Sequence, residues 1–410
     1  MVIKMNKFKQ LLIRTYQKIL YLATFFLGIK EPKIIKGENS FVELCNLLKE
    51  KGKKKVLLVT DAGLHSLNMD KLVYDEFINQ GLDYALFYDI TANPTVDQVE
   101  EGLKVYKENN CDSIVVIGGG SAMDAAKIIG ARATNNKPVN KMKGLLKITH
   151  KLPLLIAIPT TAGTGSETTL AAVISNPNTK EKFPIEDPHI TPKYTILNPK
   201  LLVKLPPHIT STTGMDALTH AVEAYIGKAN TKKTKQKALN AVKLTFKNLQ
   251  LSYEQPENLT YRENMQVAAF DAGVAFTRAY VGYVHAIAHT LGGVYHVPHG
   301  LANAIVLPYV LKKFGKSAHK KLAELYDIVV ENSSASIEDK ANTFIAMIED
   351  LNYQLNIPSN LADTIKEEDI DFMVNKAYQE AIPLYPTPTL WTKETFKKIF
   401  IQLSEQNKQK

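Results

Sequence analysis

The sequence predicts an α/β domain built on a parallel sheet, followed by an all-helical domain. Three observations support this division. A chain of 410 residues is too long for one ordinary hydrophobic core. Short apolar runs alternate with helical patterns up to about residue 205, and the 3.6-residue period prevails afterwards. We place a basic N-terminal extension at 1–30, the α/β domain at 31–205 and the helical domain at 206–410.

The predicted strands are short apolar runs separated by helical stretches. Parallel neighbours need a crossover connection, so this alternation favours a parallel sheet over hairpins. We expect strands over 56–59, 84–88, 113–117 and 154–158, with helices over 70–80 and 97–109. After residue 206, we expect helices over 217–226, 235–249, 262–279 and 284–294.

Composition narrows the class of protein. The formal charge is +9, but the lysines are dispersed, and the densest run, 51–55, is interrupted by Gly52. Without an aromatic-plus-basic motif, nucleic-acid binding is not expected. The two cysteines, Cys45 and Cys111, have no metal-ligand spacing and favour a reducing compartment, which we take to be the cytoplasm. No apolar run reaches the roughly 20 residues of a spanning helix.

The first 30 residues contain six basic side chains and no acidic one: Lys4, Lys7, Lys9, Arg14, Lys18 and Lys30. Apolar residues recur among them at helical spacing. We expect a helix whose apolar face packs on the protein's own body or on a sister subunit. The alternatives are a helix lying on a membrane surface and a cleaved signal peptide, although no small-residue cleavage site follows the apolar segment 19–29.

A glycine-rich turn joins the strand at 113–117 to the next predicted helix. Gly118, Gly119 and Gly120 let backbone N–H groups approach an anion, and the helix N-terminus favours negative charge. A second loop, 159–167, brings threonines and glycines to the carboxyl end of another predicted strand. One such loop alone could be a tight turn. Two at the same sheet edge predict a Rossmann-like nucleotide site.

Asp61 stands at the end of the first of these strands. There, a carboxylate can accept hydrogen bonds from both hydroxyls of an adenosine ribose and would repel a 2′-phosphate. The alternative interpretation is that Asp61 caps the following turn. The first interpretation favours NAD over NADP.

Histidines and one aspartate predict a metal site in the helical domain. Asp216 and His220 are four residues apart, so that both leave the same helix face, and His285 and His289 repeat this spacing. His296 and His299 follow closely. Three imidazoles and a carboxylate suit Fe²⁺ or Zn²⁺. The spacing does not decide which of the four later histidines are ligands.

Four ordered motifs resemble the iron-containing (group III) alcohol dehydrogenases: GGGSAMDAAK at 118–127, PTTAGTGSE at 159–167, TGMDALTHAVEAY at 213–225 and HAIAHTLGG with PHG between 285 and 300. The resemblance covers about residues 31–310 and implies a dehydroquinate-synthase-like architecture. It implies Asp216, His220, His285 and His299 as metal ligands, and His289 as a catalytic proton relay near the nicotinamide. The implied cofactor contacts are Asp61, Asn93, Gly119, Gly120, Ser121, Asp124, Thr160, Thr161, Thr164 and Lys182.

The resemblance implies hydride transfer between NAD(H) and an alcohol/aldehyde pair, with Fe²⁺, or alternatively Zn²⁺, polarising the substrate oxygen. It places Ala171 and Phe276 at the substrate pocket. We also expect a homodimer. Two features depart from the family: Thr290 stands where a proline is common, and residues 1–30 have no counterpart in the shorter members. Peripheral membrane contact through 1–30 stays open.

Three other functions compete with this one. A hydroxyacid–oxoacid transhydrogenase would keep its cofactor bound and would not need added NAD. A dehydroquinate-synthase-like lyase would need a cluster of basic residues, whereas the segments around the expected ligands contain only Arg278. A membrane-docked scaffold with a dead site disagrees with the intact set of expected ligands and loops.

Overall fold

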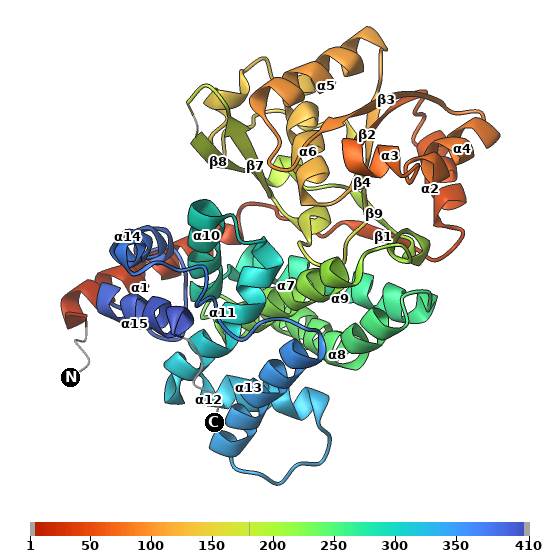
Figure 1. Ribbon diagram of the computed structural model, residues 1–410. Helices are drawn as coiled ribbons and strands as arrows, with labels where there is room; N and C mark the ends of the chain where they lie inside the picture. The colour runs from red at the N-terminus through yellow and green to blue at the C-terminus, as the bar shows by residue number, and fades with distance from the viewer. Residues whose placement is uncertain (1–4, 180, 406–410) are drawn as a thin grey trace. The chain divides into compact units, whose positions relative to one another are not determined.

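The computed structural model describes residues 5–179 and 181–405, which form two compact units (Figure 1). The sheet unit comprises residues 27–205 and 257–266. The helical unit comprises the described parts of 1–26, 206–256 and 267–410. The first helix therefore groups with the helical unit. Lys4 lies outside the described residues.

The sheet unit is built on six parallel strands in the order β1-β9-β6-β4-β2-β3. Their bounds are β1 Lys33–Lys36, β2 Lys55–Asp61, β3 Asp83–Ile90, β4 Ser113–Gly118, β6 Leu154–Pro159 and β9 Tyr194–Leu197. The expected strands are confirmed as β2, β3, β4 and β6, and the expected parallel arrangement with them. All carboxyl ends consequently meet at one edge of the sheet.

Helices complete the sheet unit: α2 Ser40–Glu50, α3 Ala62–Ser66, α4 Lys71–Asn79, α5 Val96–Glu108 and α6 Gly120–Thr134. Every residue of β4 is buried, as is the interior of β2. Such strands need apolar side chains on both faces, which explains their unbroken Val, Ile and Leu runs. Cys45 and Cys111 are both buried, and burial raises the pKa of the Cys45 thiol to about 12.

A small second sheet, β5-β8-β7, was not expected from the sequence. It consists of β5 Gly144–Leu145, β7 Ala171–Asn176 and β8 Glu181–Glu186, and β7 pairs antiparallel with β8. β7 alternates buried and half-buried residues, and β8 is largely exposed at its start. Mixed polarity of this kind resembles loop composition, so apolar runs alone do not find these strands.

The helical unit contains the remaining long helices: α1 Lys7–Thr24, α7 Pro207–Ile226, α8 Lys232–Glu254, α9 Leu259–Ala279, α10 Tyr283–Tyr295, α11 His299–Phe314, α12 Lys316–Val329, α13 Ile337–Gln354, α14 Ile370–Ala381 and α15 Lys393–Ser404. The expected helices after residue 206 are confirmed as α7, α8, α9 and α10. Residues 257–266, which include the start of α9, group with the sheet unit. α7 starts earlier than expected because Pro207 occupies its first turn, where a proline loses no hydrogen bond.

The start of α11 packs very closely on α7. A Cβ atom on Gly300 would lie 2.3 Å from the backbone oxygen of Thr212, which cannot rotate away as a side chain could. Only glycine lets these two helices approach to this distance. His299, the neighbour of Gly300, is thereby placed against α7.

We expect Gly300→Ala to lower the free energy of unfolding by about 1–3 kcal/mol, because the added methyl group overpacks a backbone contact. Gly293→Ala is the matched control, since nothing lies within 4 Å of a Cβ there and alanine favours helix. Urea unfolding of both variants measures the difference. Equal stability of Gly300→Ala and the unmodified chain would show that the helices can separate freely.

Candidate metal centre and cofactor site

α7 presents two potential ligands on one buried face. Asp216 and His220 are one helical turn apart, and their side chains are 2 % and 6 % exposed. His220 Nδ1 lies 3.8 Å from Asp216 Oδ1. The four-residue spacing seen in the sequence thus gives two donors that face the same interior point.

α10 and α11 add two imidazoles to this point. His285 Nε2 lies 3.8 Å from Asp216 Oδ1, and His299 Nε2 lies 3.4 Å from the same oxygen. One donor atom of each of Asp216, His220, His285 and His299 lies within 4.8 Å of all the others. His299 is the first residue of α11, and its side chain is 40 % exposed. The donor set therefore has three buried members and one that reaches solvent.

The donor set fits a divalent cation. A buried carboxylate is costly unless a positive charge compensates it, and imidazole binds metals in its neutral form. Burial, followed by the neighbouring histidines, lowers the pKa of His285 well below its ordinary value, which keeps the ring neutral. A neutral His285 leaves the Asp216 charge for a cation to balance.

Glu223 orients His285, a role that was not expected from the sequence. Its Oε2 lies 2.7 Å from His285 Nδ1, and its two oxygens accept hydrogen bonds from the backbone N–H groups of Gly282 and Val284. Burial raises the pKa of Glu223 to about 7. A carboxylate behind a ligand histidine fixes the tautomer and directs Nε2 toward the metal. The signal was present, because Glu223 lies seven residues after Asp216 on the same helix face.

Asn303 is a second residue that the sequence reasoning missed. Its Nδ2 donates to Asp216 Oδ1 at 2.7 Å and lies 3.2 Å and 3.1 Å from the Nε2 atoms of His285 and His299. It follows His299 by four residues on α11. This amide nitrogen touches three of the four donor groups and marks the point on which they converge.

His289 lies beside the donor set but outside it. Its ring stacks on His299 at 5.2 Å between centroids, and its Nδ1 lies 2.7 Å from Glu380 Oε1. Glu380 Oε1 also accepts a hydrogen bond from the Tyr385 hydroxyl at 2.8 Å. The side chain of His289 is 44 % exposed, so it connects the neighbourhood of the donor set with solvent.

His296 and Thr290, the two remaining residues that the sequence singled out in this segment, have structural explanations. His296 ends α10 in the left-handed conformation, with φ 57°. Thr290 continues α10 without a break, and its hydroxyl donates to the Ala286 carbonyl. The expected departure at Thr290 therefore leaves the helix intact.

The glycine-rich turn and the threonine loop face each other at the carboxyl edge of the large sheet. A Cβ on Gly119 would lie 3.9 Å from Thr161, and one on Gly120 would lie 3.6 Å from Thr164. α6 begins at Gly120, with Ser121 in its first turn. Neither glycine carries a side chain of its own over its backbone N–H, so the helix N-terminus is suited to an anion such as a diphosphate.

Two further expected cofactor residues contribute to the same edge. Thr160 follows β6, and its backbone N–H donates to the Gly118 carbonyl, which joins the two loops. Asp61 is the last residue of β2 and caps α3, since its Oδ1 accepts a hydrogen bond from Leu64 N–H. The capping interpretation of Asp61 is thus realised. Its Oδ2 lies beside Gly118, where a Cβ would be 3.5 Å away, so the ribose role stays a prediction.

Asp124 is turned into the protein. Its oxygens accept hydrogen bonds from the Ser166 hydroxyl and the Val173 N–H. Lys127, fully buried, donates to Ser166, Thr169 and the Ala171 carbonyl. These bonds hold the loop that follows β6 in place. The cofactor contact expected for Asp124 remains a prediction.

Asn93 and Lys182 meet, although 89 residues separate them. The Lys182 ammonium donates to Asn93 Oδ1 at 2.7 Å, and Asn93 adopts a left-handed conformation after β3. Four of the expected cofactor residues lie at the carboxyl ends of neighbouring strands: Asn93 after β3, Asp61 at the end of β2, Gly119 after β4 and Thr160 after β6.

Of the two expected substrate-pocket residues, Phe276 lies in the helical unit and stacks on His220 at 4.1 Å between ring centroids. Ala171 begins β7 in the sheet unit. An aromatic ring against a potential metal ligand provides an apolar wall beside the donor set.

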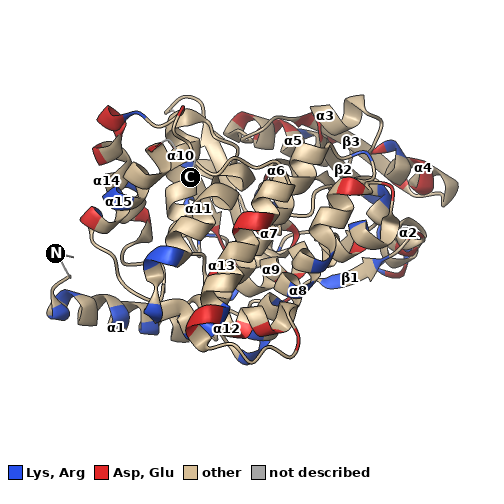
Figure 2. Cartoon of the chain, turned by 60° about the horizontal axis from the view of Figure 1, so that its bottom comes forward, with Lys and Arg blue, Asp and Glu red and all other residues tan. Residues whose placement is uncertain are grey.

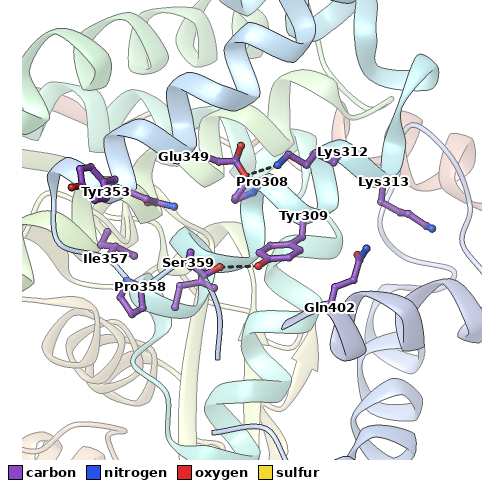
Figure 3. Close-up of a pocket in the computed structure, with 12 residues that line it drawn as sticks. Pro308, Tyr309, Lys312, Lys313, Glu349, Tyr353, Ile357, Pro358, Ser359 and Gln402 are labelled. Atoms are coloured by element: carbon purple, nitrogen blue, oxygen red, sulfur yellow. Dashed lines mark hydrogen bonds and ion pairs between the residues drawn. The ribbon is translucent and has the colours of Figure 1, made fainter. Parts of the chain in front are cut away.

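A separate pocket lies on the helical unit, lined by side chains of α11, α13, residues 357–359 and Gln402 (Figure 3). Lys312 is paired with Glu349, and the Tyr309 hydroxyl donates to the Ser359 carbonyl. None of the lining residues belongs to the donor set, so this hollow is distinct from it.

These groups define a metal-dependent oxidoreductase with a nucleotide-type cradle. Family models agree: that of the iron-containing alcohol dehydrogenases matches residues 31–199, and that of the C-terminal part of the same family matches residues 210–403. The chain belongs to the iron-containing alcohol dehydrogenase family, as its motifs predicted.

Individual relatives support the assignment. The chain is 39 % identical over 351 residues to the NAD-dependent methanol dehydrogenase of Bacillus methanolicus, covering 85 % of this chain and 92 % of that protein. It is 40 % identical to the 1,3-propanediol dehydrogenase of Klebsiella pneumoniae over 344 residues, with 82 % and 88 % covered. A crystal structure of 1,3-propanediol oxidoreductase superposes with a TM-score of 0.88 at 36 % identity, covering 92 % of this chain and 99 % of that one.

We expect His220→Ala and His285→Ala to abolish both turnover and stoichiometric metal, because each removes a donor from a closed set. His289→Ala should lose rate while keeping its metal. His296→Asn is the control, since asparagine tolerates the left-handed cap conformation and should keep both properties. Elemental analysis and turnover measure the two effects. Full metal content in His285→Ala would exclude it as a ligand, and metal loss in His289→Ala would make that residue one.

Proposed function

We propose that the protein is an NAD-dependent dehydrogenase that interconverts a short alcohol and its aldehyde at a metal held by Asp216, His220, His285 and His299. The observation that carries this proposal is the convergence of these four donors from three helices. Membership of the family supplies the reaction class. We take the metal to be Fe²⁺, with Zn²⁺ as the alternative, since both suit this donor set.

The ion would supply a Lewis acid for the substrate oxygen, and the nicotinamide would accept or donate the hydride. The residues of the chain hold these groups in place. Glu223 orients His285, while the first turn of α6 and the threonine loop would bind the cofactor diphosphate. Positioning of this kind contributes much of the rate enhancement.

We assign the proton transfer to His289. It stacks on His299 and hydrogen-bonds to Glu380, and its exposed ring can exchange a proton with water. Glu380 would stabilise the charged imidazole, as a carboxylate partner does in other proton relays.

The substrate is proposed to be a short alcohol. Two relatives are named for methanol and 1,3-propanediol. Phe276 on His220 bounds the space next to the donor set with an apolar ring. We further propose a cytoplasmic homodimer. Contact of residues 1–30 with a membrane surface is a separate proposal, because the reaction does not depend on it.

The purified protein tests the reaction directly. NADH formation should require added NAD⁺ and an alcohol, stop after chelation, and return with Fe²⁺ or Zn²⁺. A series of primary alcohols and diols would define the substrate. Exchange between a hydroxyacid and an oxoacid without added NAD would make it a transhydrogenase instead. Absence of hydride transfer from every alcohol by metal-loaded protein would disprove the proposal.

Asp61 should select NAD over NADP by charge, and two variants separate this role from its capping role. Asp61→Ser keeps an oxygen for the Leu64 N–H but loses the charge, whereas Asp61→Gly loses both. Both should shift the kcat/KM ratio toward NADP by about tenfold or more, equivalent to about 1.4 kcal/mol. Only Asp61→Gly should also lose stability. An unchanged ratio in both would leave Asp61 as a cap alone.

A further inference from the structure

α1 is attached to the helical unit by its polar side. Gln17 donates to the carbonyls of Pro383 and Tyr385 at 2.8 and 2.9 Å, and Arg14 donates to the Pro388 carbonyl. Lys9 reaches the hydroxyl of Tyr378 on the neighbouring α14 (Figure 1). The buried members of α1 are Ile13, Gln17 and Thr24. The helix packs on the protein's own body as expected, but through its polar side; packing of its apolar face on a sister subunit stays a prediction.

The opposite side of α1 is apolar and exposed. Side chains three or four residues apart share a helix face, and this face carries Phe8, Leu11, Leu12, Tyr16, Ile19 and Leu22, with Phe26 just beyond the helix. Each is between 44 % and 90 % exposed. Monomeric proteins rarely leave a contiguous apolar surface of this length, about 27 Å, without a partner.

The hydrogen bonds of Gln17 hold this orientation. Turning the apolar face inward would move Gln17 to the solvent side, break these two bonds and leave the carbonyls of Pro383 and Tyr385 without the donors they now have. The exposed face is therefore a fixed property of the folded unit.

Lysines border the exposed face on both sides. Lys7 and Lys18 lie along one border and Lys9 along the other, all exposed. Figure 2 shows Lys and Arg along α1 without Asp or Glu. The first acidic residue of the chain is Glu31. A long apolar face between two basic borders is the pattern of a helix that lies in the interface of an anionic bilayer.

We propose that α1 docks this enzyme on the surface of a membrane that contains anionic lipid, lying flat with Phe8, Leu12 and Ile19 in the headgroup boundary. The contact is peripheral, since no helix among residues 5–179 and 181–405 combines the length and apolarity that a membrane crossing requires. The proposal goes beyond the reaction, because the family match begins at residue 31 and α1 precedes it.

Charge favours lipid over a second copy of the chain. In a two-fold contact through this face, the same surface would meet itself, so the lysine borders would approach one another. Residues 5–30 contain no carboxylate that could pair with them. Like charges brought together oppose such a contact, whereas lipid phosphates would neutralise both borders.

Co-sedimentation of the full chain with vesicles tests the proposal. Binding should be strong to phosphatidylcholine vesicles that contain phosphatidylglycerol, weak to pure phosphatidylcholine, and should fall as salt rises. Leu12→Glu/Ile19→Glu should lose more than about tenfold in binding, since two apolar anchors are removed. Lys7→Gln/Lys18→Gln should lose about fivefold per lysine, on anionic vesicles only.

Leu72→Glu/Ile337→Glu is the matched control, because both residues are exposed apolar side chains on other helices. It should bind as the unmodified chain does. All variants should keep the same melting temperature and metal content. The proposal is overturned if the full chain ignores anionic vesicles, or if the control loses binding equally. It is also overturned if Leu12→Glu/Ile19→Glu reduces the oligomer mass in solution, which would show that a second copy covers the face.

Discussion

The burial of the Asp216 carboxylate is the constraint on which the helical unit depends. Its side chain is 2 % exposed, and a buried anion without compensation costs several kcal/mol. Burial disfavours the charged form of His285, so this imidazole cannot supply the compensation. A divalent cation can compensate the charge of Asp216. Binding such a cation requires that three separate helices hold their donor atoms within a few ångströms of one another. The contact of Gly300 with the Thr212 backbone meets this requirement by joining α11 closely to α7.

Glu223 is a second buried carboxylate in the helical unit, and backbone N–H groups stabilise it by hydrogen bonding. Its oxygens accept hydrogen bonds from the N–H groups of Gly282 and Val284. These groups lie at the N-terminus of α10, where the helix dipole favours negative charge. One side chain on α7 therefore caps α10 and orients the histidine that α10 contributes. The position of His285 relative to Asp216 is consequently set by helix packing before any metal binds.

The sequence predicted those parts of the molecule in which residues of one kind recur at a regular spacing. Buried parallel strands appear as unbroken apolar runs, so β2, β3, β4 and β6 could be located. Ligand pairs appear at four-residue spacing, so the Asp216/His220 pair could be located as well. Glu223 and Asn303 follow the same helical rule at seven and four residues, and a search along the ligand face would have found them. The bond between Lys182 and Asn93 and the network around Lys127 could not be found, because they join residues distant in sequence. β7 and β8 were missed because their composition is that of a loop.

α1 shows why amphipathic pattern alone does not decide which face of a helix packs. The usual inference assumes that the apolar side contributes most to packing, since its burial removes area from water. At α1, the segment 383–388 instead presents backbone carbonyls to the helix, and these are satisfied by the amide of Gln17 and the guanidinium of Arg14. If the apolar face packed here instead, these carbonyls would be buried without hydrogen-bond donors, which is costly in free energy. The polar face of α1 therefore turns inward. The apolar face then stays available at the surface for a partner outside the chain.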